Sequence, residues 1–330
     1  MARALLLNEA EKKVTASVVD IAEADFPEGD VELDVLYSTL NYKDGMIIRG
    51  LGRLVRSYPH VPGVDMVGVV RRSENDRFKA GDVVLATGWR IGESYWGGYS
   101  TFARVDSDFC IKLPDNLSPV TAMSLGTAGI SAMQGIIALE EQGLPGLKEM
   151  GNVLVTGSAG GVGSVAIIAL SALGYGVTAS TRRIQESDYL TSLGATEVIS
   201  ADEVSGELSR PLESERWIGA IENVGGSTLG RIVSQMYTGA SIASIGLAAG
   251  AVFTANVMPF LLRGVNILGI DSVKYPNEKR YVAWERLGEL VPSEKMASMT
   301  QIATLNDLEH LADQILAGGV RGRVVIDVNG

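Results

Sequence analysis

A strand pattern, a glycine-rich turn and an apolar helix pattern follow one another in the middle of this 330-residue chain. Residues 153–155 are apolar and mostly β-branched, as in a strand that is buried on both faces of a sheet. The turn over residues 157–163 reads GSAGGVG, and an apolar run continues to Leu173. Glycine at such a turn lets backbone N–H groups approach a pyrophosphate at a helix N-terminus, because no Cβ blocks the approach. The pattern therefore predicts a dinucleotide site.

The glycine spacing matches the dinucleotide fingerprint Gly-x-Gly-x-x-Gly in part. Gly160 and Gly163 hold its second and third positions, whereas Ser158 stands at the first. A purely structural turn is the alternative, since glycine also joins strands to helices where no nucleotide binds. The residues of the turn that we expect to contact the cofactor are Ala159, Gly160, Gly161 and Val162.

The end of the next predicted strand, residues 176–180, indicates which dinucleotide binds. Sites for NAD place an acid about 20 residues after the glycines, where it binds the ribose 2′-hydroxyl. This chain has Ser180, Thr181 and Arg182 there, followed by Arg183 and without an acid. Hydroxyls and a guanidinium bind a 2′-phosphate, so we expect NADPH to be the cofactor. The alternative is that the arginines end a solvated loop.

Composition limits the other partners. The formal net charge of −11 argues against general binding to nucleic acid or anionic membranes. The single cysteine, Cys110, excludes an internal disulfide framework and suits a reducing compartment. The first residues do not read as a signal peptide, and we expect no apolar run long enough to span a membrane. These features predict a cytoplasmic protein.

Secondary-structure patterns divide the chain into parts of different character. Residues 1 to about 120 read as short strands separated by turns. The strands expected there cover residues 2–7, 31–36, 67–72, 82–86 and 98–105. Strand and helix patterns then alternate up to about residue 245, which predicts a parallel sheet covered by helices on both faces. The pattern is mixed after about residue 255 and ends in a strand over residues 323–328, so the nucleotide domain is inserted between two parts of another domain.

Several segments resemble the medium-chain dehydrogenase/reductases, in their order along the chain. They are residues 41–44 (NYKD), 62–68 (PGVDMVG), 97–99 (GGY), 125–129 (LGTAG) and the glycine turn. The run over residues 258–272, MPFLLRGVNILGIDS, resembles the acrylyl-CoA reductase branch, whose members were earlier described as quinone-oxidoreductase-like.

This resemblance implies a fold, a domain division and an assembly. The implied α/β fold is a doubly wound, parallel Rossmann sheet inserted into a β-rich, GroES-like catalytic domain. The catalytic domain would cover residues 1–122 and 256–330, and the NADP-binding domain residues 123–255. The implied assembly is a homodimer formed through the nucleotide domains, by sheet extension near residues 255–270. In this family a glycine is common where the chain has Thr181, whose β-branched side chain disfavours positive φ.

The zinc ligands of metal-dependent relatives are absent from this sequence. Those relatives place a cysteine where this chain has Asn41 and a histidine where it has Val64. The whole chain has one cysteine and two histidines, too few for the usual zinc ligand sets, so we expect no metal. Without a metal to acidify an alcohol, hydride transfer to an already conjugated acceptor is the expected chemistry.

Tyr42 is the residue that we expect to donate the proton in such a reduction. The resemblance to enoyl reductases implies a tyrosine beside the nicotinamide, and a phenol with an ordinary pKa of about 10 can donate at neutral pH. Asn41 and Asp44 would shape the same loop and are grouped with it as catalytic residues. Tyr42 would also contact the cofactor. The alternative is that Tyr42 is a steric wall or a ribose ligand and that water gives the proton.

Arginines without neighbouring acids follow this loop. Arg49, Arg53 and Arg56 could hold the phosphates of a CoA thioester, although a solvated loop or a dimer contact explains them as well. Arg323 is a further candidate for substrate binding, or a surface residue at a strand end. The resemblance also places Leu247 and Ser272 at the cofactor, with a core position and a turn as the alternatives.

The function that we expect is NADPH-dependent reduction of the C=C bond of a short α,β-unsaturated acyl-CoA, first of all acryloyl-CoA to propanoyl-CoA. An NADPH:quinone or enone reductase is the nearest alternative, because it would use the same fold and hydride. A binding or structural protein on a reductase fold is an alternative from another class, since a fold does not determine a function.

Overall fold

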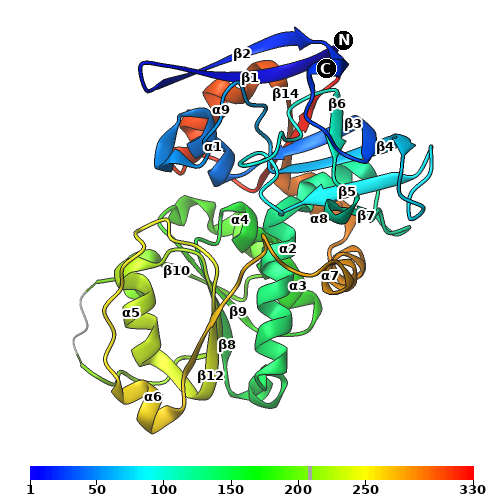
Figure 1. The fold of residues 1–330 in the computed structure, drawn as a ribbon. Helices are drawn as coiled ribbons and strands as arrows, with labels where there is room; N and C mark the ends of the chain where they lie inside the picture. Colours follow the sequence, from blue (N-terminus) through cyan, green and yellow to red (C-terminus); the bar gives the residue numbers. More distant parts are fainter. Residues whose placement is uncertain (207–209) are drawn as a thin grey trace. The chain divides into compact units, whose positions relative to one another are not determined.

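The structure, a computed structural model, describes residues 1–206 and 210–330 and divides them into two compact units (Figure 1). Unit 1 comprises Met1–Thr127, Ser272–Gly288 and Met296–Gly330, and unit 2 comprises Ala128–Asp271 and Glu289–Lys295. The sequence-based boundary at residue 255 therefore differs from the structural one. Residues 256–271 belong to unit 2 because strand β13 (Asn266–Gly269) pairs in parallel with strand β12 (Met236–Ser244).

Unit 2 contains a six-stranded parallel sheet in the order β10-β9-β8-β11-β12-β13. Its other strands are β8 (Asn152–Thr156), β9 (Val177–Thr181), β10 (Glu197–Ser200) and β11 (Trp217–Glu222). The chain runs outward from β8 in one direction and from β11 in the other. The strand order thus reverses between β8 and β11, which is where a doubly wound sheet binds its ligand. The predicted fold class is confirmed.

Helices join the strands of unit 2. They are α3 (Gly161–Ala172), α4 (Ser187–Leu193), α5 (Gly226–Gln235) and α6 (Met258–Arg263). Helix α3 follows the glycine turn and buries eight consecutive residues from Gly163 to Leu170, as its apolar sequence requires. The second half of the sheet has a core that includes Leu154, Ile232 and Ile242.

Unit 1 contains a seven-stranded sheet in the order β14-β15-β3-β4-β5-β7, with β6 also paired to β3. Its strands are β3 (Val31–Leu40), β4 (Asp65–Ser73), β5 (Val83–Thr87), β6 (Phe102–Val105), β7 (Cys110–Lys112), β14 (Thr300–Thr304) and β15 (Arg323–Asp327). Strands β1 (Ala2–Ala10) and β2 (Lys13–Ile21) form an antiparallel hairpin. Strand β15 runs antiparallel to β3, so distant parts of the sequence complete one sheet.

Helices that contribute residues to unit 1 include α1 (Tyr42–Ile48), α7 (Asn277–Leu290), α8 (Ser293–Met299) and α9 (Leu308–Leu316). Helix α1 packs on α9 so closely that a Cβ on Gly45 would lie 2.8 Å from Cγ2 of Ile315. We expected no apolar run long enough to span a membrane. The apolar helix α2 (Pro119–Glu141) corrects this expectation, because it is long and apolar enough to do so. It is nevertheless a core element by its surroundings, since 78% of its apolar 18-residue window is buried.

Candidate active site

The glycine turn of unit 2 has the geometry of a phosphate cradle. Gly157 has a φ of 58°, and Gly160 is the N-cap of α3. A Cβ on Gly163 would lie 2.6 Å from Cα of Ser158, so no larger residue fits there. Ser158 locks the turn to the neighbouring strands, because its Oγ lies 2.7 Å from Val155 O and 2.8 Å from Ser180 O. The first N–H groups of α3 have no acceptor within the helix, which suits an anion.

The residues at the end of β9 and directly after it differ in how accessible they are. Ser180 and Thr181 are buried, whereas Arg182 is exposed and has no hydrogen-bond or ion-pair partner in the described part of the chain. Arg183 is tied to the turn, because its Nη2 donates to Ala159 O over 3.2 Å. Thr181 ends β9 in an extended backbone, which a β-branched residue adopts readily. Arg182 is therefore the free cation of this segment.

In unit 1, Asn41 begins the helix that carries Tyr42. The Asn41 N–H donates to Oδ2 of Asp44 over 2.8 Å, and the two residues form a reciprocal capping box at the start of α1. Tyr42 is the first residue of the helix and its side chain is 45% exposed. Its hydroxyl has no partner among residues 1–206 and 210–330, so it is free to meet a ligand.

A buried polar cluster supports this helix start. Asn41 Nδ2 donates to Oδ2 of Asp65 over 2.8 Å and to Oδ2 of Asp44 over 3.2 Å. The N–H of Val64 donates to Oδ1 of Asp44 over 3.0 Å, and the hydroxyl and N–H of Thr127 both donate to Asp65. Burial, and next the charge of Asp65, raise the pKa of Asp44 to about 7. Asp44 therefore changes its charge near neutral pH.

Arg323 supplies the positive charge of the cluster. Its guanidinium is buried and donates to Ser124 O over 3.0 Å, to Asn41 Oδ1 over 3.2 Å and to the hydroxyl of Thr39. Burial lowers the pKa of Arg323, and the charges of Asp65 and Asp44 act in the opposite direction. This placement argues against the substrate-binding role that we expected for Arg323, because protein acceptors already take its donors.

The three arginines that we expected to bind the CoA phosphates, Arg49, Arg53 and Arg56, have different surroundings in the structure. Arg49 binds the carboxylate of Asp313 through Nε and Nη2, over 2.7 and 2.8 Å, and also pairs with Glu309. It thereby ties α1 to α9, which argues against a phosphate-binding role. Arg53 and Arg56 are exposed, and neither pairs with a carboxylate in the described ranges.

The two remaining cofactor candidates fall in different units. Leu247 follows β12 in unit 2 and is 61% exposed. This exposure excludes the alternative that Leu247 is a core residue. Ser272 belongs to unit 1, and its carbonyl accepts a hydrogen bond from Nη2 of the buried Arg280 over 3.1 Å. The sequence reasoning did not predict Asp65 as a site residue. The available signal was an acid at the start of a strand whose next five residues, MVGVV, are uncharged.

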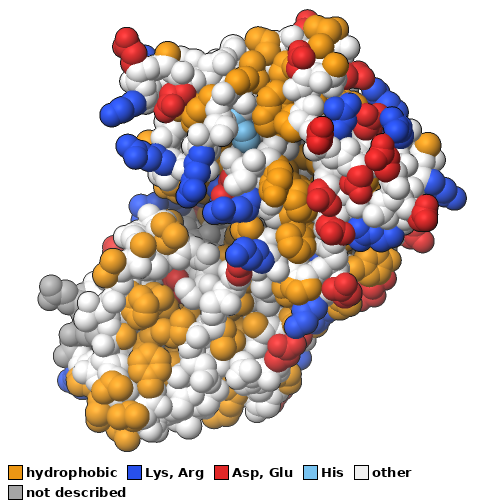
Figure 2. Space-filling view, in the orientation of Figure 1, with side chains coloured by type: hydrophobic (Ala, Val, Ile, Leu, Met, Phe, Trp, Pro, Cys, Tyr) orange, Lys and Arg blue, Asp and Glu red, His pale blue; other side chains and the backbone are white. Residues whose placement is uncertain are grey.

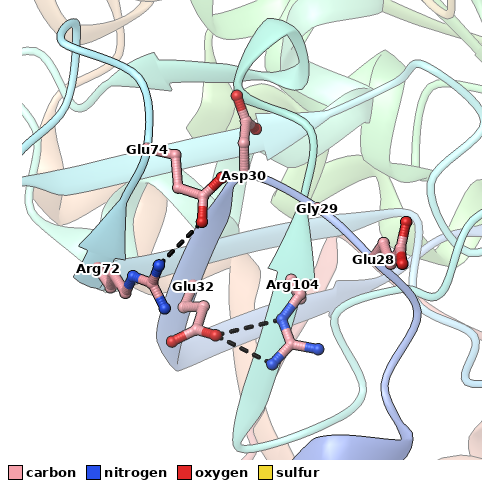
Figure 3. A pocket seen from close by; sticks show the side chains of 7 residues that line it. All are labelled: Glu28, Gly29, Asp30, Glu32, Arg72, Glu74 and Arg104. Atoms are coloured by element: carbon pink, nitrogen blue, oxygen red, sulfur yellow. Dashed lines mark hydrogen bonds and ion pairs between the residues drawn. The ribbon is translucent and has the colours of Figure 1, made fainter.

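An open pocket in unit 1 lies apart from these residues (Figure 3). Its charged lining residues are Glu28, Asp30, Glu32, Glu74, Arg72 and Arg104. Arg72 pairs with Glu74 and Arg104 with Glu32, each at 2.9 Å, so both cations are already neutralised. The acids outnumber the arginines, and the pocket is a poor site for an anionic substrate.

Comparisons with known proteins agree with this geometry. The zinc-binding dehydrogenase family matches residues 161–288, and the alcohol dehydrogenase GroES-like domain family matches residues 27–115. Acrylyl-CoA reductase AcuI of Ruegeria pomeroyi is 52% identical over the full length of both chains. The crystal structure of the YhdH oxidoreductase of Salmonella enterica in complex with NADP has a TM-score of 0.96 at 43% identity and covers 100% of both chains. The chain belongs to the acrylyl-CoA reductase branch of the medium-chain dehydrogenase/reductases.

The resemblance predicted from sequence is thus confirmed. A further relative within the medium-chain dehydrogenase/reductases is YhfP of Bacillus subtilis, a putative quinone oxidoreductase, which is 40% identical over 96% of this chain and 97% of its own. Its crystal structure with NAD bound has a TM-score of 0.95 and covers 99% of both chains.

The positions where zinc-dependent medium-chain dehydrogenase/reductases bind their metal have other roles here. Asn41 uses its amide to hold Asp65 and Asp44, and Val64 is an apolar residue packed in a core with Leu7 and Ile47. No group of three or more histidine, cysteine or acidic side chains that could hold a metal occurs within residues 1–206 and 210–330.

Proposed function

We propose that this protein reduces the C=C bond of a short α,β-unsaturated acyl-CoA with NADPH, converting acryloyl-CoA to propanoyl-CoA without a metal. The observation that carries the proposal is the full-length, 52% identity to a protein named as an acrylyl-CoA reductase. The capped helix start with an exposed Tyr42, at the positions where zinc-dependent relatives bind metal, supports the same chemistry.

The glycine turn and Arg182 fit the phosphates of NADPH. Backbone N–H groups of Ala159, Gly161 and Val162 would hold the pyrophosphate at the start of α3. Gly160 would line the same turn without donating, because its N–H already donates to Gly157 O over 3.0 Å. The exposed guanidinium of Arg182 would bind the 2′-phosphate, with the hydroxyls of Ser180 and Thr181 beside it. Bound NADPH supplies a hydride for the β-carbon of the acyl group. Leu247 and Ser272 complete the set of residues proposed to contact the cofactor.

Tyr42 donates the proton to the α-carbon in this proposal, and Asn41 and Asp44 hold it in place. The capping box determines where α1 begins, and therefore where its first residue lies. A free hydroxyl in an exposed side chain suits a donor that must reach a bound substrate. Water as the proton donor is the alternative, and the Tyr42 variant described below distinguishes the two.

The thioester would be held through its CoA phosphates by Arg53 and Arg56, the two exposed arginines after α1 that remain free. Both stand in an overall acidic protein, in which an anionic substrate needs a local positive patch.

A homodimer through unit 2 and a cytoplasmic location complete the proposal. Figure 2 shows hydrophobic side chains gathered over unit 2 around α6. The exposed hydrophobic residues in and directly before α6 are Val257, Met258, Leu261 and Leu262. Strand β13, which follows α6 in the sequence, is an edge strand of the sheet in unit 2. It could pair with β13 of a second copy and so extend the sheet across a dimer. Sedimentation of Leu261→Glu should give a monomer where the wild type gives a dimer; a monomeric wild type would remove this part.

A substrate panel tests the reaction. Rates of NADPH oxidation would be compared with acryloyl-CoA, crotonoyl-CoA and a benzoquinone, each over a range of concentrations. We expect the highest kcat/KM with acryloyl-CoA. A higher value with the quinone would favour the quinone reductase suggested by the name of the Bacillus subtilis relative. Binding of NADPH without turnover of any acceptor would indicate a non-enzymatic role.

A further inference from the structure

The loop over residues 88–95, which follows β5 in unit 1, has a strained backbone. Trp89 and Arg90 are consecutive residues other than glycine with φ values of 52° and 64°, and Gly92 follows with a φ of 75°. Such left-handed conformations are unfavourable for residues with a side chain, and they persist only where the surrounding structure holds them. Strain of this kind is common at functional sites. The loop is therefore a candidate for a functional role.

Contacts within unit 1 hold this loop on several sides. Nε2 of the buried His60 lies 2.8 Å from Gly92 O. The ring of Trp89 stacks on that of Phe109, with the ring centroids 6.0 Å apart. The N–H of Glu93 donates over 3.1 Å to a carbonyl oxygen of the same turn. Glu93 thus projects from a backbone whose position is fixed.

The side chain of Glu93 reaches the start of α1 through Lys43. Nζ of Lys43 lies 2.8 Å from Oε1 of Glu93, although the two residues are 50 positions apart in sequence. The Glu93 side chain is only 8% exposed, and that of Lys43 is 38% exposed. A buried carboxylate needs a partner, because burying it alone is far more costly than burying it in a pair. Lys43 is the cation that pairs with Glu93 in the described part of the chain.

Stability alone is a weak reason for such an ion pair. The cost of removing two charges from water offsets most of their attraction, and apolar side chains of similar volume often stabilise a fold as well or better. The pair does set the distance between the two elements that it joins. Here these elements are the strained loop and the helix that begins with Tyr42.

Lys43 stands between Tyr42 and Asp44 in the first turn of α1. Successive side chains of an α-helix point about 100° apart, so these three residues face three directions. Asp44 is held on the buried side by the capping box and the polar cluster, and Lys43 is held by Glu93. With two successive side chains fixed, the turn cannot rotate about the helix axis. Since α1 has only seven residues, it depends on such contacts to hold its first turn.

We infer that Glu93 is a positioning residue, which acts through Lys43 to hold the first turn of α1 in the rotation that directs the Tyr42 hydroxyl at the substrate. The inference rests on the proposed function, in which Tyr42 donates the proton, and it adds a second contact to the capping box that Asn41 and Asp44 form. Glu93 touches neither the cofactor nor the substrate in this role.

Steady-state kinetics in two backgrounds test this assignment. Glu93→Gln keeps the size of the side chain and removes its charge. We expect kcat with acryloyl-CoA to fall about tenfold, because a misplaced donor reacts more slowly, and the Kd of NADPH to stay nearly the same. In the Tyr42→Phe background the same substitution should lower kcat by less than about twofold, because the group that Glu93 orients is already absent. An unchanged kcat in the single variant, or equal losses in both backgrounds, would overturn the inference.

Asp82→Asn is the matched control. Asp82 pairs with Lys112 over 2.9 Å and is 14% exposed, so it is also a largely buried carboxylate held by a lysine of unit 1. We expect this control to keep the kcat of the wild type, and a loss equal to that of Glu93→Gln would contradict a specific role for Glu93. If Glu93→Gln does not fold, Lys43→Gln removes the same ion pair from its more exposed side and should give the same result in both backgrounds.

The orientation of Tyr42 can also be followed by NMR without turnover. In protein with labelled tyrosine rings, the signal of Tyr42 is assigned by its loss in Tyr42→Phe. It should shift in Glu93→Gln and stay in place in Asp82→Asn. An unshifted signal would overturn the inference even where kcat falls. A wild type that reduces no unsaturated acyl-CoA would contradict the proposed function, and the NMR comparison would then decide the positioning role of Glu93 by itself.

Discussion

Arg323 donates a hydrogen bond from Nη1 to Oδ1 of Asn41 over 3.2 Å, although 282 residues separate the two in sequence. The same Asn41 side chain donates from Nδ2 to the carboxylates of Asp65 and Asp44. The residue that begins α1 is thus held between one buried cation and two buried acids. Because Tyr42 is the next residue, its position depends on the protonation and integrity of this cluster.

The raised pKa of Asp44 predicts that stability depends on pH in a defined window. With its pKa raised to about 7, Asp44 keeps its proton in the folded state up to about pH 7, whereas an aspartate in the unfolded chain releases its proton near the ordinary pKa of 3.8. The free energy of unfolding should therefore fall as the pH rises from about 4 to 7, by up to about 1.4 kcal/mol per pH unit. Urea unfolding of the wild type and of Asp44→Asn over this range measures the effect. Equal pH dependences would show that Asp44 does not titrate as described.

Replacing Tyr42 tests the proton donor. Tyr42→Phe should lower kcat about 100-fold with acryloyl-CoA, because the general acid is lost, and should leave the Kd of NADPH nearly unchanged. Tyr95→Phe is a suitable control, since Tyr95 is another exposed tyrosine of unit 1 (51% against 45% for Tyr42). If Tyr42→Phe retains a kcat within a few-fold of the wild type, water is the donor.

Arg182 should determine the preference for the phosphorylated cofactor. Arg182→Ala should raise the KM for NADPH by about 10- to 100-fold, because a charge-assisted contact to the 2′-phosphate is lost. The KM for NADH serves as the internal control and should stay the same. Comparable losses with both cofactors would place Arg182 elsewhere in the binding site or in the fold.

Charge reversal at Arg53 tests the site for CoA. Arg53→Glu should raise the KM for acryloyl-CoA about tenfold and leave the KM for NADPH unchanged. Acryloyl-pantetheine, which has the thioester but lacks the nucleotide phosphates of CoA, should be reduced equally well by the variant and the wild type. A variant indistinguishable from the wild type with acryloyl-CoA would exclude Arg53 from the substrate site.

The nucleotide half of the fold could be predicted because its signals are local. The structure has strand β8 at the apolar run 153–155. The glycine turn follows this strand, and helix α3 follows the turn, both as predicted. The end of this domain was harder to predict. Strand β13 is short and only partly buried, and it joins unit 2 by pairing with β12, a long-range contact that no neighbouring residue reveals.

The roles of individual arginines could not be predicted for a related reason. Arg49, Arg53 and Arg56 look alike in the sequence, yet only Arg49 meets the acids of α9, which lie about 260 residues away. Arg323 resembled a surface residue at a strand end, but β15 places it in the interior beside Asn41. A charged residue can be assigned to a substrate only when its partners in the folded chain are known.

The pairing of β15 with β3 has a consequence for the order in which the protein is made. Residues 31–40 leave the ribosome early, but their neighbours at residues 323–327 are synthesised nearly 300 residues later. Until Arg323 has been synthesised, the polar cluster at the start of α1 lacks its positive charge. By then most of unit 2 has been translated and can fold by itself. The start of the helix that carries Tyr42 is thus completed among the last parts of the protein. A truncated product would contain the nucleotide fold but not the finished polar cluster beside Tyr42.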